Sequence, residues 1–129
     1  MKKIIQPKDL SRPANYSPGV LVTPGRLLFI AGQTALDSDG NVVGIGDPAA
    51  QTRQIYENIG RILSEAGGTF SDLVKITRYM TDLSFKTEIN RIQSEYLKED
   101  PPASTGIVVK GLAREAFLVE IEAVACIDK

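Results

Sequence analysis

Two acidic side chains, Glu120 and Glu122, interrupt a segment that is otherwise mostly apolar. If residues 117–127 form a strand, the alternation of side chains places both carboxylates on the same face. One interpretation is an edge strand whose face meets solvent. The other is that Glu120 lines a cleft and binds a water molecule, because burial raises the pKa of a carboxylate toward neutrality, where it can exchange protons. Glu120 is therefore the candidate catalytic residue.

Arg78 occupies a position at which an apolar residue is expected. The apolar members of the segment 71–80 alternate with polar ones, as in a strand, and they are Val74, Ile76 and Met80. Arg78 falls in their register, and a charged group on an inward face is rarely left unpaired. It either forms an intersubunit or helix-covering salt bridge, or it offers a planar guanidinium to the carboxylate or carbonyl of a ligand.

Two hydroxyl residues precede or begin the predicted strand 105–109. Ser104 and Thr105 have no base partner in the sequence, so nucleophilic catalysis is not expected, and they either hydrogen-bond at the strand start or contact a substrate. Gly106 leaves room in a cleft or marks a bulge. Lys110 lies on the same strand face as Ser104 and Gly106, and it is a second candidate cation.

The sequence contains no histidine and a single cysteine, Cys126. The chain therefore cannot supply a Ser-His-Asp or Cys-His nucleophile pair, a zinc site of His or Cys ligands, or an intrachain disulfide. No nucleotide-binding motif is present either, so we expect no cofactor and no metal. One cysteine is typical of a protein of the reducing cytosol.

Length and charge limit the class of protein further. With 129 residues the chain is expected to form one domain, residues 1–129, and with 43% apolar and 24% charged residues it has the composition of a soluble globular protein. The 15 basic and 16 acidic side chains nearly balance, which argues against binding to nucleic acid or to an anionic membrane. No membrane-spanning run or signal peptide is visible, and we expect a cytoplasmic location.

The elements expected to position these residues have the order β-β-α-β-α-β-β. The chain up to residue 17 is expected to be an extended lead-in, and strands 19–23 and 27–31 to pair as a hairpin around a turn at Pro24–Gly25. A helix is expected to begin at the N-cap Asp47, followed by Pro48, and to end at Gly67–Gly68. The remaining predicted elements are a strand at 71–80, a helix at 85–98, and strands at 105–109 and 117–127.

Two helices can cover only one face of such a sheet, which predicts a two-layer α+β domain. The last predicted strand nevertheless carries apolar side chains on both faces: Val119, Ile121, Ala123 and Ala125 on one, Leu118, Val124 and Cys126 on the other. The face that the helices leave uncovered is therefore expected to be buried by another copy of the chain.

Three blocks of sequence carry a resemblance to a known family. They are LFIAGQ at 28–33, QTRQIYENI with LSEAG and DLVK between 51 and 75, and PAST with VEIEAVA between 102 and 125. In order and spacing they resemble the RidA/YjgF/YER057c/UK114 family, whose members are often described as endoribonuclease L-PSP or translation inhibitor. The resemblance extends over about residues 15–126.

The resemblance implies a chorismate-mutase-like α+β fold, a homotrimer and three clefts between subunits. Enzymatic members of the family hydrolyse reactive enamines and imines to keto acids and ammonia. In those members an arginine after the Pro-Ala pair binds the substrate carboxylate, and a glutamate on the last strand positions the hydrolytic water.

By position, the family's glutamate matches Glu120 and its N-terminal aromatic residue matches Tyr16. The glycine at the strand end matches Gly32, although the serine that often precedes it is Ala31 here. The asparagine of the second helix matches Asn90.

The family's arginine has no match, because Ser104 stands in its place, and the cysteine two positions further on is Gly106 here. This chain therefore resembles the subgroups that lack the arginine. The sequence predicts a cofactor-free trimer that hydrolyses a small imine, enamine or related carbonyl compound. One alternative is a non-catalytic trimer that binds a small metabolite. Another is an endoribonuclease or translation inhibitor, which the charge balance and the lack of histidine disfavour.

Overall fold

A computed structural model of the chain describes residues 1–23 and 25–128, and these residues form six strands and two α-helices. The strands are β1 (Lys2–Ile5), β2 (Gly19–Val22), β3 (Arg26–Gln33), β4 (Leu73–Met80), β5 (Ala103–Val108) and β6 (Val119–Ile127), and the helices are α1 (Pro48–Glu65) and α2 (Lys86–Tyr96). Short 3-10 turns at Phe70–Asp72 and Leu83–Phe85 lead into β4 and α2. Pro24, the first residue of the predicted turn at Pro24–Gly25, lies outside the described residues.

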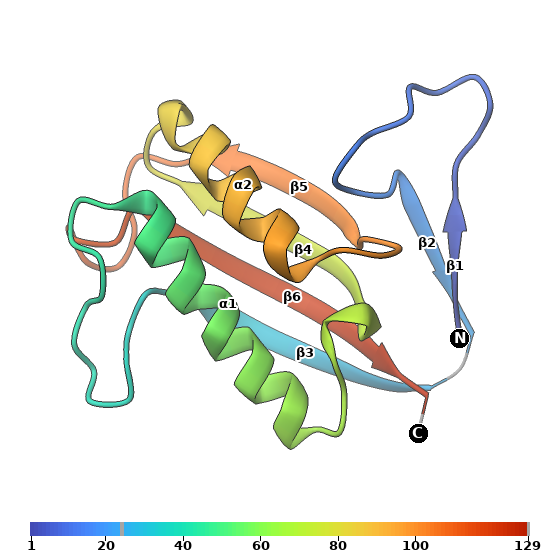
Figure 1. Ribbon diagram of the computed structural model, residues 1–129, viewed down its shortest axis with the longest axis horizontal. Helices are drawn as coiled ribbons and strands as arrows, with labels where there is room; N and C mark the ends of the chain where they lie inside the picture. The colour runs from blue at the N-terminus through green and yellow to red at the C-terminus, as the bar shows by residue number, and fades with distance from the viewer. Residues whose placement is uncertain (24, 129) are drawn as a thin grey trace.

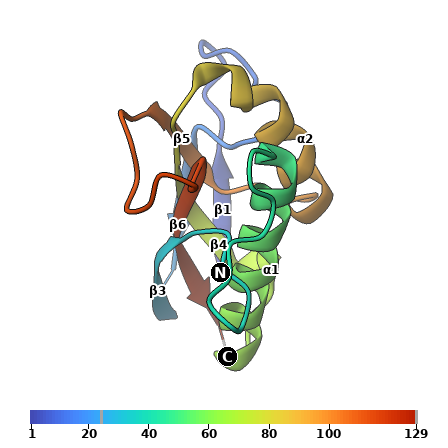
Figure 2. The ribbon, with the colours of Figure 1, turned by 90° about the vertical axis from the view of Figure 1, so that its left-hand side faces the viewer.

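The molecule has two layers. Strands β3, β6, β4 and β5 form one sheet in that order, with β4 and β5 parallel and the other neighbours antiparallel. Both helices lie on one face of this sheet, as Figures 1 and 2 show. The predicted two-layer α+β architecture is confirmed. None of the helices in the described part of the chain is long and apolar enough to cross a membrane.

Helix α1 begins where the sequence predicts. The backbone of Asp47 is extended, and its carboxylate accepts a hydrogen bond of 3.1 Å from the Ala50 amide, which caps the helix beside Pro48. The inward face of the helix is completely buried against the sheet, and its members are Ile55, Ile59 and Leu63.

Helix α2 packs beside α1 through an aromatic and amide contact. The Tyr56 ring of α1 stacks on Tyr96 of α2, with 5.2 Å between ring centroids, and the Tyr56 hydroxyl donates to Gln93 Oε1 at 3.0 Å. Burial raises the pKa of the Tyr56 phenol, so the hydroxyl keeps the proton that it donates. The Gln93 side chain is thereby held at the inner face of α2.

The predicted hairpin is wrong. Strand β2 pairs with β1, whose four residues, Lys2–Ile5, were expected to be part of an extended lead-in, and β3 pairs instead with β6 at the far end of the chain. Gly25 therefore connects two different sheets. Residues 26–30 and Gln33 of β3 pair with residues 123–127 and Ile121 of β6, so a long-range pairing replaces the short local one.

The start of β4 also differs from the prediction. A register shift between Leu73 and Lys75 inserts an extra residue opposite β6, so that Leu73 is buried and Val74, which was expected to point inward, is only partly covered. Beyond this bulge the predicted alternation holds, and Ile76, Arg78 and Met80 are all buried on the helix side.

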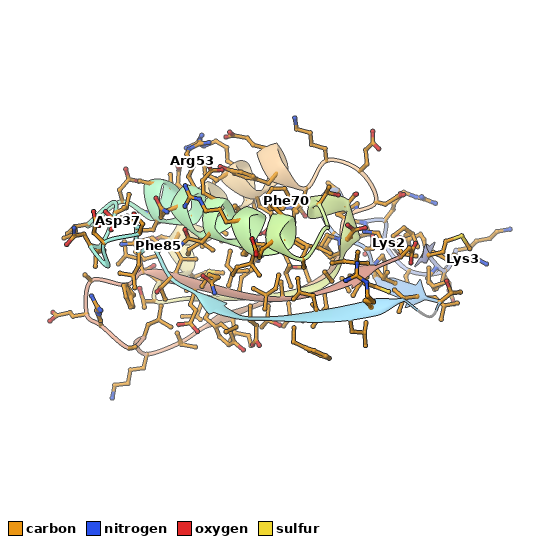
Figure 3. All side chains as sticks on the ribbon, turned by 90° about the horizontal axis from the view of Figure 1, so that it is seen from below. Lys2, Lys3, Asp37, Arg53, Phe70 and Phe85 are labelled. Atoms are coloured by element: carbon orange, nitrogen blue, oxygen red, sulfur yellow. The ribbon has the colours of Figure 1, made fainter. Side chains whose placement is uncertain are left out.

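The other face of the four-stranded sheet is open. Side chains extend from both faces of the sheet in Figure 3, but the helices cover only one of them. On the open face Leu27 is 56% and Phe29 is 72% exposed, and Phe29 lies opposite Val124 of β6. A large apolar side chain this exposed in the middle of a strand is unusual for the surface of a monomer.

Candidate functional site

A pocket of about 350 Å³ lies where β4 and β5 meet the first turns of α2 and the chain that precedes β2. It brings together Tyr16, Arg78, Asn90, Ser104 and Gly106, five of the nine site residues that the sequence predicts. Its apolar lining comes from the ends of the same strands and from the turn before α2, and it includes Met80, Leu83 and Val108.

Arg78 is the centre of this pocket. Arg78 is only 7% exposed. Its Nη1 donates hydrogen bonds to Asn90 Oδ1 at 2.5 Å and to Gln93 Oε1 at 3.2 Å. Nε is buried and has no hydrogen-bond partner. Gln93 is in turn held by the Tyr56 hydroxyl, so one edge of the guanidinium rests on a fixed amide network while another side faces the pocket.

No carboxylate neutralises Arg78 among the described residues. Ion pairs between described residues join Met1 to Asp128, Arg53 to Glu95 and Arg91 to Glu88, so the helix-covering salt bridge considered for Arg78 does not form within the described chain. Burial lowers the pKa of the guanidinium from its ordinary value, and the nearby Tyr56 opposes this effect. An arginine nevertheless stays charged at neutral pH. A buried cation with neutral partners favours an anionic ligand, because such a ligand would supply the missing charge.

Gly106 leaves the space that the guanidinium fills. Arg78 and Gly106 are opposite one another on the parallel strands β4 and β5, and Arg78 Nη2 lies only 3.1 Å from where a Cβ on residue 106 would be. Ser104 lies opposite Ile76, two residues further back on β5. The positive charge thus comes from β4 in this chain, next to the β5 position at which the family has its arginine.

Tyr16 reaches the pocket because the lead-in is tied to the segment before β5. The Ser17 amide donates to the Pro102 carbonyl at 3.1 Å, and the Ser17 hydroxyl donates to the Pro101 carbonyl at 2.5 Å. Tyr16 itself is 42% exposed, so its ring stands at the mouth of the pocket rather than within it.

The other four predicted site residues do not line this pocket. Glu120 lies opposite Tyr79 in the β4–β6 register, and Thr105 lies opposite Thr77, which places both on the open face of the sheet. Lys75 Nζ donates to the Thr105 hydroxyl at 2.6 Å on that face. Lys110 follows β5, is exposed, and does not line the pocket.

On the open face, the Glu120 side chain lies against the backbone of Gly32. The β3–β6 register shifts between Ile30 and Gln33, which makes Ala31 and Gly32 a bulge. The Glu120 carboxylate lies directly over this bulge, since a Cβ on residue 32 would overlap it. Beside it, the Tyr79 hydroxyl donates to the Glu122 carboxylate, and this hydrogen bond raises the pKa of the Tyr79 phenol.

One chain therefore holds two separate groups of predicted site residues, on opposite faces of its sheet. Ile107 connects them, because it belongs to the open-face register opposite Tyr79 and also lines the pocket at the sheet edge. Lys86, which was not among the residues predicted from the sequence, also lines the pocket, one helical turn before Asn90. The spacing of four residues could have indicated it. No cluster of three or more His, Cys, Asp or Glu side chains in the described part of the chain is arranged to hold a metal ion.

Comparisons with known proteins agree with the resemblance seen in the sequence. The profile of a family described as endoribonuclease L-PSP matches residues 8–127. The chain is 36% identical to the RutC family protein PYRAB12510 of Pyrococcus abyssi over 125 aligned residues, and this alignment covers 96% of each sequence.

Solved structures of related proteins share the fold. A protein of unknown function of the conserved Rid protein family, YyfB from Yersinia pestis, superposes with a TM-score of 0.90 at 35% identity over 98% of both chains. Rv2704 from Mycobacterium tuberculosis, a member of the YjgF/YER057c/UK114 family, superposes with a TM-score of 0.70 at 32% identity, covering 87% of this chain and 86% of the other.

Proposed function

Since this chain belongs to the endoribonuclease L-PSP family, which includes the Rid and YjgF proteins, we propose that it hydrolyses a small anionic imine, enamine or related carbonyl compound in a cleft between the subunits of a homotrimer. The observation that carries the proposal is Arg78, a buried guanidinium that has amide partners, an unpaired Nε and no neutralising carboxylate among the described residues.

Arg78 has the role of the substrate anchor. A planar guanidinium can donate two parallel hydrogen bonds to a carboxylate, and such charge-assisted bonds are strongest where water is excluded. Asn90 and Gln93 hold it from one side, and Gly106 leaves it room from the other. The guanidinium thus supplies from β4 the charge that Ser104 on β5 lacks.

Glu120 has the role of positioning the water, from a neighbouring subunit. The open sheet face that carries Glu120 also carries the exposed Leu27 and Phe29, and two helices cannot cover it. Burial of this face against further copies of the chain would place Glu120 of one subunit at the edge where the pocket of the next one opens, near Ile107.

The reaction needs no cofactor, because an imine carbon is already electrophilic. A water molecule attacks this carbon while Glu120 accepts a proton from the water, and the electron pair of the C=N bond moves to nitrogen. Delivery of this proton to nitrogen gives a carbinolamine, which carries a hydroxyl and an amino group on the same carbon. The hydroxyl proton is then transferred to the amino group as the C=O bond forms and the C–N bond breaks, so that ammonia and a carbonyl compound leave. Arg78 holds the substrate carboxylate throughout, so that binding provides the orientation on which the rate depends.

The test is the release of keto acid from imines that an amino-acid oxidase forms in situ, measured against spontaneous hydrolysis. We expect the wild-type protein to accelerate release, and Glu120→Gln to lower the rate by about 10²-fold, as for other general bases. Glu122→Gln is the matched control, since it changes a carboxylate of the same strand face and keeps an acceptor for Tyr79. No acceleration by the wild type, or a Glu120→Gln protein that melts earlier but turns over normally, would refute this function.

A second candidate function follows from Ser104. The pocket of a single chain contains neither the family's arginine nor a carboxylate, which suits a trimer that binds a keto or imino acid without transforming it. Such a protein would bind keto acids in calorimetry and leave the hydrolysis rate of every imine unchanged. Net charge −1 and the lack of histidine give no support to ribonuclease activity.

A further inference from the structure

We infer that the pocket selects a ligand with two anionic groups, one bound at Arg78 and the second at Lys86, so that the substrate class is a small dicarboxylic or phosphate-bearing imino or keto acid. This inference rests on the proposed function and specifies its substrate. Lys86 has no assigned part in the expected chemistry, and the position that it occupies at the pocket rim is what suggests one.

The charge of the pocket favours a ligand with two anionic groups. Among its lining residues two are cationic, Arg78 and Lys86, and none is acidic. The remaining polar members, among them Asn90 and Ser104, are neutral. A ligand with one carboxylate would neutralise only one of the two cations, whereas a dianion would neutralise both.

The ammonium of Lys86 is free to bind a ligand. It is exposed and makes no hydrogen bond or ion pair with any described residue, whereas the carboxylates of Glu88 and Glu95 on the same helix both pair with arginines. Lys86 is the first residue of α2, where the positive end of the helix dipole disfavours a cation. The N-terminal end of the helix dipole and the Lys86 ammonium are both positive, so both attract an anion to the rim of the pocket.

Lys86 and Arg78 are close enough for one short ligand to contact both. Lys86 and Asn90 are four residues apart on α2, so their Cβ atoms lie about 5–6 Å from one another on one helix face. Asn90 Oδ1 in turn lies 2.5 Å from Arg78 Nη1. A flexible lysine side chain can therefore bind the far end of the same short ligand whose first carboxylate lies on the guanidinium. A pocket of about 350 Å³ has room for this longer ligand.

The experiment is isothermal titration calorimetry with two keto acids of equal chain length, 2-oxoglutarate and 2-oxopentanoate. They differ in the second carboxylate, and as hydrolysis products they are not consumed. We expect 2-oxoglutarate to bind about five- to tenfold more tightly, as for one exposed charge-assisted contact. Lys86→Gln should abolish this difference and leave 2-oxopentanoate binding unchanged. Lys98→Gln, a change at an exposed lysine just beyond α2, should alter neither affinity.

Phosphonopyruvate distinguishes the two kinds of second anion. Tighter binding than that of 2-oxoglutarate, also lost in Lys86→Gln, would identify a phosphate-type group, and weaker binding would identify a carboxylate. Equal affinities for 2-oxoglutarate and 2-oxopentanoate, or a difference that survives in Lys86→Gln, would overturn the inference while leaving the proposed function in place. If neither keto acid binds, the proposed function itself falls. Lys86→Gln removes a cation from a helix N-terminus, so its melting temperature should not decrease, which excludes misfolding as the cause.

Discussion

At the scale of single residues, the chain places its buried positive charge on β4. Arg78 is 7% exposed and held by the oxygens of Asn90 and Gln93, and Gly106 opposite it has no side chain to compete for the space. A Cβ on residue 106 would lie 3.1 Å from Arg78 Nη2, so a side chain there would crowd the guanidinium.

Arg78→Lys tests whether ligand binding needs the planar guanidinium of Arg78. Lysine keeps the charge and can still donate to Asn90 or Gln93, but it cannot bind a carboxylate with two parallel hydrogen bonds. We expect keto-acid affinity to fall about tenfold, the equivalent of one lost charge-assisted hydrogen bond. Arg91→Lys, at an exposed arginine of α2, is the control and should bind keto acids normally. Unchanged affinity in Arg78→Lys would mean that the ligand does not contact the guanidinium.

At the scale of the elements, two irregularities of the strands prepare the site. The bulge of β3 between Ile30 and Gln33 brings the Gly32 backbone beneath the Glu120 carboxylate of β6. The parallel pairing of β4 with β5 places Arg78 beside Gly106 and Ser104 beside Ile76. A regular antiparallel hairpin would produce neither arrangement.

Gly32→Ala should displace Glu120. The added Cβ would overlap the carboxylate, and the side chain would have to leave its place over the bulge. We expect imine hydrolysis to fall at least tenfold, because a misplaced water or base slows the reaction, while the trimer persists. Gly111→Ala is the control, since a Cβ there meets no atom within 4 Å. Wild-type turnover in Gly32→Ala would show that the place of Glu120 over Gly32 does not matter.

Local signals were enough to predict some elements and not others. Asp47–Pro48 predicted the start of α1 correctly because a helix cap depends on neighbouring residues alone. The alternation in β4 placed Arg78 on the buried face for the same reason. The Pro24–Gly25 signal suggested a hairpin, but the true partner of β3 is β6, about a hundred residues away, and no local pattern encodes that choice.

Some of the predicted site residues lie together in the structure, and others lie apart. Tyr16, Asn90, Ser104 and Gly106 do meet Arg78 in one pocket, whereas Glu120 and Gly32 lie on the other face of the sheet. Strand alternation separates Glu120 from the neighbouring inward residues, but only the sheet order shows which side the helices cover. Lys86 was missed because a lysine at the start of a helix looks like an ordinary surface residue.

At the scale of the whole molecule, the account requires the open face to be an interface between copies. Phe29 is 72% exposed on it. We expect Phe29→Glu to break the assembly into monomers, because a carboxylate buried at an interface costs several kcal/mol unless it is paired. Ile45→Glu, at a residue that is 75% exposed in the loop before α1, should leave the assembly intact.

Sedimentation velocity would distinguish these two variants from the wild type. A Phe29→Glu protein that sediments with the wild type would show that the open face is not the contact. A wild-type protein that is a stable monomer at micromolar concentration would exclude the trimer altogether.

If Arg78 of one subunit and Glu120 of another serve one site, two inactive variants should restore activity to each other in mixed trimers. Arg78→Met and Glu120→Gln proteins should each be inactive. When the two are unfolded together and reassembled in equal amounts, mixed trimers each contain one site with both intact residues, and about a quarter of the wild-type rate should return if subunits mix at random. A mixture that forms mixed trimers yet stays as inactive as its parents would contradict the account.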